Sequence, residues 1–178
     1  MRSHSLIRGE TAIHDRIQIM HKKTKSILLA LVVGAIAAPL LYAASVHFKG
    51  GSPTFSDQGT TLKTCFSLAG LGNGDVTITV KTTGSATTLC TNQGGNTAPG
   101  QNKTPVAPSA QQTFPSTQIK NGNLSACLTT APPPAPSASE AGCPNSNWST
   151  SLTDVSFDTA QITVVQGGQV VLQQTFRP

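Results

Sequence analysis

The chain has 178 residues and a formal net charge of +5, and only 11% of its residues are charged and 4% aromatic. Six basic residues and two acids precede residue 44, so the 135 residues that follow carry a net charge of only +1. No basic patch interleaved with aromatic residues remains in that part, which excludes nucleic-acid binding and a polybasic membrane surface as expected functions.

A signal peptide is predicted over residues 20–43. A basic run after Met20 leads into the apolar block Ile27–Leu41, and Ala43 places a small residue at the expected cleavage point. The block is about 15 residues long, shorter than the roughly 20 that a spanning helix needs, so a signal anchor is the less favoured alternative. Residues 1–19 lack signal character and are expected to be an upstream extension from a start codon assigned too early. After cleavage, we expect no stable membrane span.

Residues 44–178 are expected to form a single all-β domain, because several runs alternate apolar and polar residues with a period of two. The side chains on the apolar faces of these runs are Leu62, Thr64, Phe66, Leu68, Val76, Ile78, Val80, Leu124, Ala126, Leu128, Ile162 and Val164. Asn73-Gly74 and Asn121-Gly122 are tight-turn dipeptides, and Gln166–Gly168 separates the last two runs. This spacing predicts an antiparallel β-sandwich of immunoglobulin-like type with about seven or eight strands.

Two long polar loops interrupt the pattern, over residues 91–110 and 131–147. The second contains Pro132–Pro134 and Pro136, which permits a polyproline ligand, although a solvated loop is the favoured interpretation. Trp148, the only tryptophan, is expected to anchor the end of this loop on the core. Its alternative role, beside Asn145 and Asn147, is an aromatic platform for a sugar.

Four cysteines follow the predicted cleavage site, and an even number in an exported chain predicts disulfides with three possible connectivities. Cys65 and Cys127 each lie mid-strand opposite the apolar face, and neighbouring antiparallel strands can bring such Cα atoms to about 4.5 Å. Cys90 and Cys143 lie at the ends of the two long loops. The favoured pairs are therefore Cys65–Cys127 and Cys90–Cys143. Zinc is the rival, but the chain has no C-x-x-C, and His47 is its only histidine after residue 44.

No group of residues predicts catalysis. His47 lies near the expected mature N-terminus, where chains often fray. Asp154 and Asp158 could share a strand face, but four extended residues separate their backbones by roughly 13 Å, beyond the 5–9.5 Å of glycosidase carboxyl pairs. The run Gly70–Asp75 is similar to a dinucleotide-binding loop but precedes a strand instead of opening a helix. We expect no catalytic residue, metal site or cofactor.

Three segments carry a resemblance. They are Cys90–Asn102 (C-T-N-Q-G-G-N-T-A-P-G-Q-N), Gly70–Val76 (G-L-G-N-G-D-V) and Cys143–Trp148 (C-P-N-S-N-W). Together they resemble a group of uncharacterised exported bacterial proteins, over most of residues 62–176. The resemblance implies a bacterial exported protein and supports the pairing of Cys90 with Cys143, but it implies no activity, ligand or catalytic residue.

The expected function is therefore that of an exported, non-enzymatic β-sandwich, a structural or interaction module that is secreted, periplasmic or on the cell surface. Its expected partner is a cell-surface protein or a glycan. The alternative is a small module that binds sugar or calcium through the loops Cys90–Asn102 and Cys143–Trp148. The candidate binding residues in these loops are Asn92, Asn96, Gln101, Asn102, Asn147 and Trp148.

Overall fold

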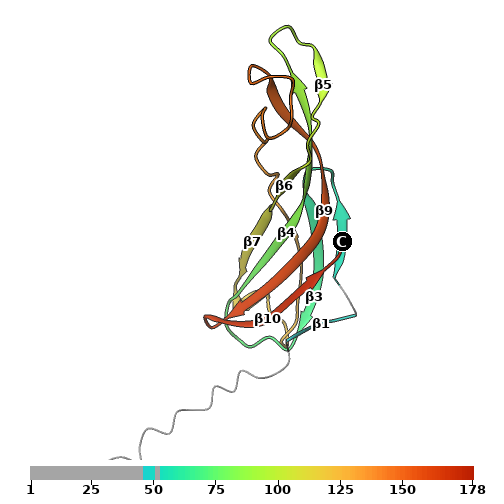
Figure 1. Ribbon diagram of the computed structural model, residues 1–178. Helices are drawn as coiled ribbons and strands as arrows, with labels where there is room; N and C mark the ends of the chain where they lie inside the picture. Colours follow the sequence, from blue (N-terminus) through green and yellow to red (C-terminus); the bar gives the residue numbers. More distant parts are fainter. Residues whose placement is uncertain (1–45, 51–52) are drawn as a thin grey trace, which may run out of the picture. The chain divides into compact units, whose positions relative to one another are not determined.

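The computed structural model describes residues 46–50 and 53–178, so the predicted signal peptide and upstream extension lie outside the described residues. Ten strands and one 3-10 turn make up the described part (Figure 1). They are β1 (His47–Phe48), β2 (Thr54–Asp57), β3 (Leu62–Ala69), β4 (Val76–Thr91), β5 (Thr97–Pro99), β6 (Thr104–Val106), β7 (Ser109–Phe114), η1 (Ser116–Gln118), β8 (Leu124–Thr129), β9 (Ser149–Gln166) and β10 (Gln169–Phe176). The all-β prediction is confirmed, but the chain has ten strands instead of seven or eight.

The smaller sheet is built around β3. Strand β8 pairs along one edge of β3, while β2 and β1 follow one another along the other edge, and every pairing is antiparallel. In β3, residues alternate strictly between buried and partly exposed. The predicted apolar face of this strand therefore points into the sandwich, as the period-two pattern requires.

The larger sheet is built around β4 and β9, which pair over their whole lengths. Strand β10 covers the outer edge of β9, and the free edge of β4 is shared by β7, β6 and β5 in succession. Pro108, which has no backbone N–H to donate to a ladder, lies at the break between β6 and β7, and residues 100–103 separate β5 from β6. The segment predicted as a loop over residues 91–110 therefore contains β5, β6 and the first residues of β7.

The core lies between the two sheets and consists of large apolar side chains from both. Its buried members are Phe66, Leu68, Leu71, Val76, Ile78, Val80, Phe114, Leu124, Leu128, Ile162 and Val164. At one edge of the sandwich, Phe176 of β10 packs edge-on against Phe48 with ring centroids 5.4 Å apart, and lies 5.8 Å from Phe55. These contacts connect the β10 edge to the β1/β2 edge.

Two of the predicted turns have the backbone conformation that their residues favour. Asn121 and Gly122 both have positive φ (51° and 74°), and the flanking Lys120 and Asn123 exchange two backbone hydrogen bonds. Gly167 and Gly168 likewise have positive φ and join β9 to β10. Both turns fit two-residue hairpins of type I′, whose twist matches that of the strands they connect.

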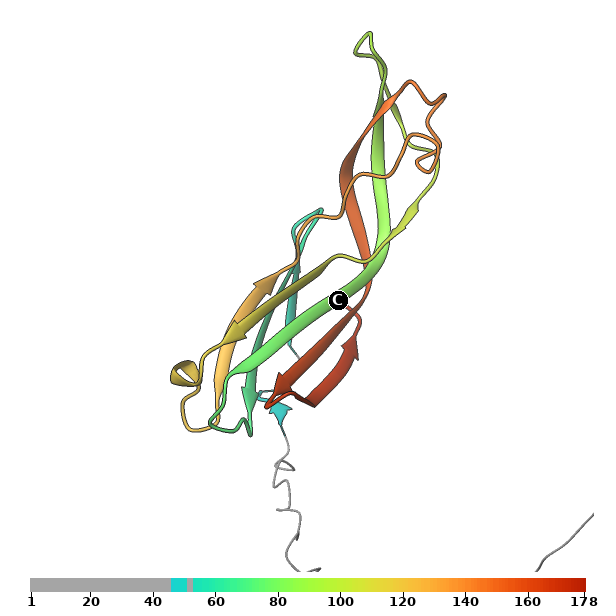
Figure 2. The same cartoon turned by 90° about the vertical axis from the view of Figure 1, so that its left-hand side faces the viewer.

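The strands β4 and β9 continue together beyond the sandwich (Figures 1 and 2). We call this extension the distal ribbon: residues 84–91 of β4 and 149–157 of β9, with β5, β6 and the covering segment 131–148. It begins at a β-bulge, where the register shifts between Thr83 and Gly84. A side chain at Gly84 would overlap the carbonyl oxygen of Ser156, so the close approach of the two backbones requires glycine.

Candidate binding site on the distal ribbon

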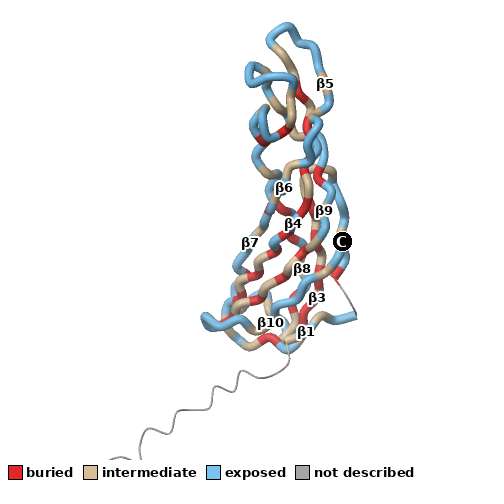
Figure 3. Tube along the Cα trace, viewed as in Figure 1, coloured by how far each residue is buried: buried red, intermediate tan, exposed pale blue. Residues whose placement is uncertain are grey.

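The interior of the distal ribbon is made of small side chains. Ala86, Cys90, Ala141 and Val155 are fully buried, and Thr88 is 2% exposed. Figure 3 shows few buried positions in this part compared with the sandwich. Because such side chains bury little apolar surface, the ribbon gains less from the hydrophobic effect than the sandwich does.

The Cys90–Cys143 disulfide closes this small interior and fastens the covering segment to β4, with the two Cα atoms 5.8 Å apart. The other disulfide, Cys65–Cys127, joins directly opposed residues of β3 and β8 on the outer face of the smaller sheet, with Cα atoms 4.0 Å apart. Both predicted pairings are therefore confirmed. No cysteine of the described chain is free, and two disulfides fit an oxidising compartment.

Gly100 brings the returning strand close against β4. Its N–H donates to the carbonyl oxygen of Thr88 (2.9 Å), and a methyl group at this position would overlap the Thr88 hydroxyl and lie 2.9 Å from the carbonyl oxygen of Ala141. Two residues later, Asn102 donates from its backbone N–H to Ala141 (3.0 Å) and from its side chain to the carbonyl of Glu140 (3.1 Å). The Gly100–Asn102 segment thus attaches the covering segment to the ribbon.

The hairpin turn at the end of the ribbon is organised by Asn92. Its side-chain oxygen accepts from the N–H of Asn96 (2.9 Å), its backbone N–H donates to the carbonyl of Asn96 (3.0 Å), and its carbonyl accepts from the N–H of Gly95 (3.0 Å). Gly95 has φ +79°, a conformation that glycine adopts without strain. On the covering segment, the side-chain oxygen of Asn145 accepts from the N–H of Asn147 (3.0 Å). Both asparagines therefore use their oxygen to fix a turn, as is typical of this residue.

These two turns enclose a small polar hollow of about 290 Å³, which we call the tip hollow. It is lined by Asn92, Gln93, Gly94, Asn145, Asn147 and Trp148. Exposure decreases from Asn147 and Asn145, which are exposed, to Asn92 and Trp148, which are partly buried. Side chains from two loops more than 50 residues apart in sequence thus meet at one place.

The structure brings together three of the six predicted binding residues: Asn92, Asn147 and Trp148. Asn96 lies in the adjoining turn but does not line the hollow. Gln101 donates to the carbonyl oxygen of Pro99 (3.0 Å), and Asn102 attaches the covering segment, so both of these side chains have structural contacts away from the hollow. Asn145, which the sugar interpretation placed beside Trp148 but which was not among the six, also lines the hollow, whereas Gln93 and Gly94 were not predicted.

The remaining sequence candidates are dispersed. Asp75 accepts the N–H of Ser116 (2.8 Å) at the start of η1, and the Gly70–Asp75 run crosses between the sheets, held by the buried Gln166. Asp154 and Asp158 lie on β9 at its two register shifts. Within residues 46–50 and 53–178, no three His, Cys, Asp or Glu side chains come together in a way that could hold a metal ion.

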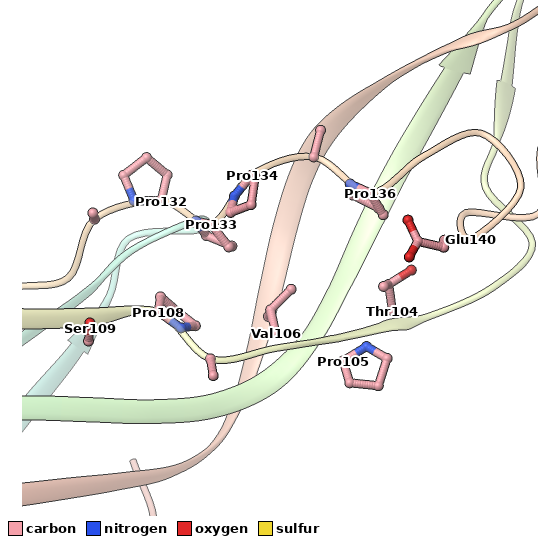
Figure 4. A pocket seen from close by; sticks show the side chains of 13 residues that line it. Thr104, Pro105, Val106, Pro108, Ser109, Pro132, Pro133, Pro134, Pro136 and Glu140 are labelled. Carbon is pink, nitrogen blue, oxygen red and sulfur yellow. The ribbon is translucent and has the colours of Figure 1, made fainter.

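A second concavity, which we call the proline groove, lies between the start of the ribbon and its covering segment (Figure 4). Its volume is about 500 Å³. The lining residues are Thr104, Pro105, Val106, Ala107, Pro108, Ser109, Ala131, Pro132, Pro133, Pro134, Ala135, Pro136 and Glu140. The sequence placed prolines in both long loops, but nothing in the local pattern indicated that they would face each other.

Glu140 is the one charged residue of this groove. Its Oε2 accepts hydrogen bonds from the hydroxyl (2.6 Å) and the backbone N–H (2.8 Å) of Ser137, and these two bonds lower the pKa of the carboxyl below its usual value. Ser137 and Glu140 thus form a reciprocal capping box around a single turn, since the N–H of Glu140 also donates to the Ser137 hydroxyl (3.3 Å).

No protein-family model matches this chain, and no curated protein matches it. Among the described residues, there is no helix with the length and apolar character needed to cross a membrane.

Proposed function

We propose that this chain is an exported, non-enzymatic interaction module of immunoglobulin-like type that presents the end of its distal ribbon to a cell-surface partner. The leader pattern supports export to the cell surface, the periplasm or the medium, and the resemblance supports a bacterial source. The strand order supports the immunoglobulin-like type, because three rows around β3 face four rows around β4 and β9, and the connections β3–β4, β7–β8 and β8–β9 cross between the sheets.

The main support for the proposal is that a rigid extension holds the tip hollow at the end of the distal ribbon. Strands of 16 and 18 residues hold the tip hollow away from the sandwich, and a disulfide fixes the two loops that line it. In Figure 1, β1 lies at the opposite end of the described part from β5. A chain that needed only a stable sandwich would gain nothing from this extension, whereas loops on a rigid scaffold commonly carry binding function.

A glycan is the second candidate, as the ligand of the tip hollow. The side-chain oxygens of Asn92 and Asn145 are engaged in turns, which leaves their amide N–H groups available to donate, together with the whole amide of Asn147. Trp148 adds the apolar surface of a partly exposed aromatic ring. Calcium is a weaker ligand for this lining, because calcium sites draw on carboxylates and the lining has none.

The experiment uses the exported product and the fluorescence of Trp148, the only tryptophan. Titration with a glycan panel, and separately with calcium and then a chelator, should give a saturable change only for a true ligand. Trp148→Phe keeps an aromatic ring, and Trp148→Ala removes it. The ligand should still raise the melting temperature of Trp148→Phe but not that of Trp148→Ala. A shift that survives Trp148→Ala and Asn147→Ala would place the ligand elsewhere and reject the hollow as its site.

Export and the absence of catalysis are tested separately. The new N-terminus of the exported protein should be Ala44, give or take one residue, and a membrane-retained product that keeps residues 27–41 would contradict export by cleavage. The few titratable groups, one histidine and five acids after residue 44, offer little for general acid–base catalysis. Hydrolytic turnover abolished by His47→Gln would overturn the non-enzymatic proposal.

A further inference from the structure

We propose that the proline groove is a second binding site, which takes an extended peptide segment of a partner protein with a lysine side chain directed at Glu140. The site is separate from the tip hollow, because the two linings share no residue. Binding in the proline groove is therefore independent of binding in the tip hollow.

The walls of the groove are two extended segments that run in opposite directions. Residues 104–109 form one wall and 131–136 the other, and Figure 4 shows Val106 and Pro108 pointing across from the first toward the second. The volume of about 500 Å³ lies within the range of roughly 300–1,000 Å³ that ligand sites occupy. A space between two extended segments fits a third extended segment better than it fits a compact ligand.

Both walls are fixed before any ligand arrives. The carbonyl oxygen of Pro108 accepts from the hydroxyl (2.8 Å) and the N–H (2.9 Å) of Thr82, and Ser109 accepts from the N–H of Ala131 (3.2 Å). At the other end, the hydroxyl of Thr150 donates to the carbonyl oxygen of Pro136. Proline rings add stiffness because φ is locked. A preformed groove loses little conformational entropy on binding.

The lining is rich in hydrogen-bond acceptors and poor in donors. Six of the thirteen lining residues are prolines, which carry no N–H. No hydrogen bond within the described residues reaches the carbonyl oxygens of Pro132–Ala135. A ligand that satisfies this lining must therefore bring its own N–H donors, as the backbone and side chain of a lysine-bearing peptide do.

The polar end of the groove has the matching charge. Ser137 holds Oε2 of Glu140, while no hydrogen bond from a described residue reaches Oε1, which is left to accept from a ligand. The hydroxyl oxygen of Thr104 is enclosed, has no hydrogen-bond partner among the described residues, and points toward Glu140 in Figure 4. With a carboxylate as the one charge of the lining, the groove favours a cation over an anion.

The test uses the exported protein and a blocked peptide of sequence Leu-Ala-Lys-Ala-Leu, whose only charge is the lysine. A second peptide replaces lysine with norleucine, which keeps the alkyl chain and removes the charge. We expect saturable binding of the lysine peptide and about fivefold weaker binding of the norleucine peptide, the scale of one partly screened ion pair. Raising the salt concentration should weaken only the lysine peptide.

Variants locate the site. Glu140→Gln keeps an acceptor for Ser137 but removes the charge, and should erase the difference between the two peptides. Val106→Arg should fill the groove and abolish binding, while Trp148→Ala and the matched surface variant Asp158→Asn should change nothing. Circular dichroism checks that each variant is folded. Equal binding of both peptides, no saturation, or an equal loss in Asp158→Asn and Glu140→Gln would each overturn the proposal.

Discussion

The two disulfides should stabilise the chain to the same extent but in different parts of it. They close loops of similar length, with sequence separations of 62 and 53 residues. Loop-closure entropy then assigns about 4 kcal/mol to each at 25 °C. The unfolding free energy of a domain of this size falls by about 2 kcal/mol per molar of urea, so losing either disulfide should lower the urea midpoint by about 2 M.

The location of each disulfide decides which signal reports the loss. Cys65–Cys127 ties β3 to β8 inside the unit that contains every residue of the large apolar core. Cys90–Cys143 ties the distal ribbon, which contributes no residue to that core. Replacing Cys90 and Cys143 with alanine should therefore loosen the ribbon first, whereas replacing Cys65 and Cys127 should destabilise the sandwich and the ribbon together.

Urea unfolding with two probes measures this difference. Trp148, the only tryptophan, lines the tip hollow, so its fluorescence follows the ribbon, while circular dichroism follows the strands as a whole. In the Cys90→Ala/Cys143→Ala protein, the fluorescence midpoint should precede the dichroism midpoint by about 1–2 M. In the Cys65→Ala/Cys127→Ala protein, both midpoints should fall together. Coincident transitions in the first protein, or separated ones in the second, would refute the assignment of the ribbon as a weaker unit.

Three further predictions concern single side chains. Thr64→Val should raise the unfolding free energy by about 1 kcal/mol, because the buried Thr64 hydroxyl has no hydrogen-bond partner among the described residues. Thr82→Val should lower it by about as much, because it removes a buried hydrogen bond to the carbonyl of Pro108, and urea midpoints measure both changes. Gly100→Ala should lower the unfolding free energy by about 1–3 kcal/mol through overpacking. Gly94→Ala should lower it by less than about 0.5 kcal/mol, because the new methyl group would meet its neighbours at 3.4 Å or more. Because the pKa of Glu140 is lowered in the folded chain, its turn is stabilised at pH values above the pKa that Glu140 has in the unfolded chain. This stabilisation is lost as the pH falls through the folded pKa. Carboxyl NMR shifts should give a pKa of Glu140 below the usual value, and an ordinary pKa would contradict the hydrogen-bonded turn.

The sandwich could be predicted from the sequence because its signals are local. The period-two alternation predicted which residues of β3 and β8 face inward. Because Cys65 and Cys127 both lie at outward-facing positions of these runs, it also predicted their disulfide. The signals for the turns at Asn121-Gly122 and Gly167-Gly168 were also local, because a positive φ depends on only one or two residues. The short strands β5 and β6 were missed because Pro99, Pro105 and Pro108 indicate a loop locally, whereas β4 pairs with segments that contain Pro99 and Pro105.

The two concavities depend on contacts that no local pattern contains. The tip hollow needs Asn92 and Trp148 at the same place, which follows only from the Cys90–Cys143 connection, and that connection was favoured without knowing which side chains it would bring together. The proline groove needs the 104–109 and 131–136 segments side by side. Their relative position depends on where β6 and β7 pair along β4, a long-range register that prolines do not encode.

One signal for the distal ribbon was nevertheless present in the sequence, in the sizes of alternate residues along β4. The buried face of this strand is Val76, Ile78, Val80, Thr82, Gly84, Ala86, Thr88 and Cys90. In the structure, burial alternates without a break over all 16 residues, and the side chains on the buried face become small after Thr82. Large side chains are needed where a second sheet lies about 10 Å away, and small ones where only a loop covers the strand. The change at Gly84 therefore marks where the smaller sheet ends and the covering segment begins. Small side chains bury too little surface to hold that segment alone, which is why a cysteine ends the series and joins it covalently to Cys143.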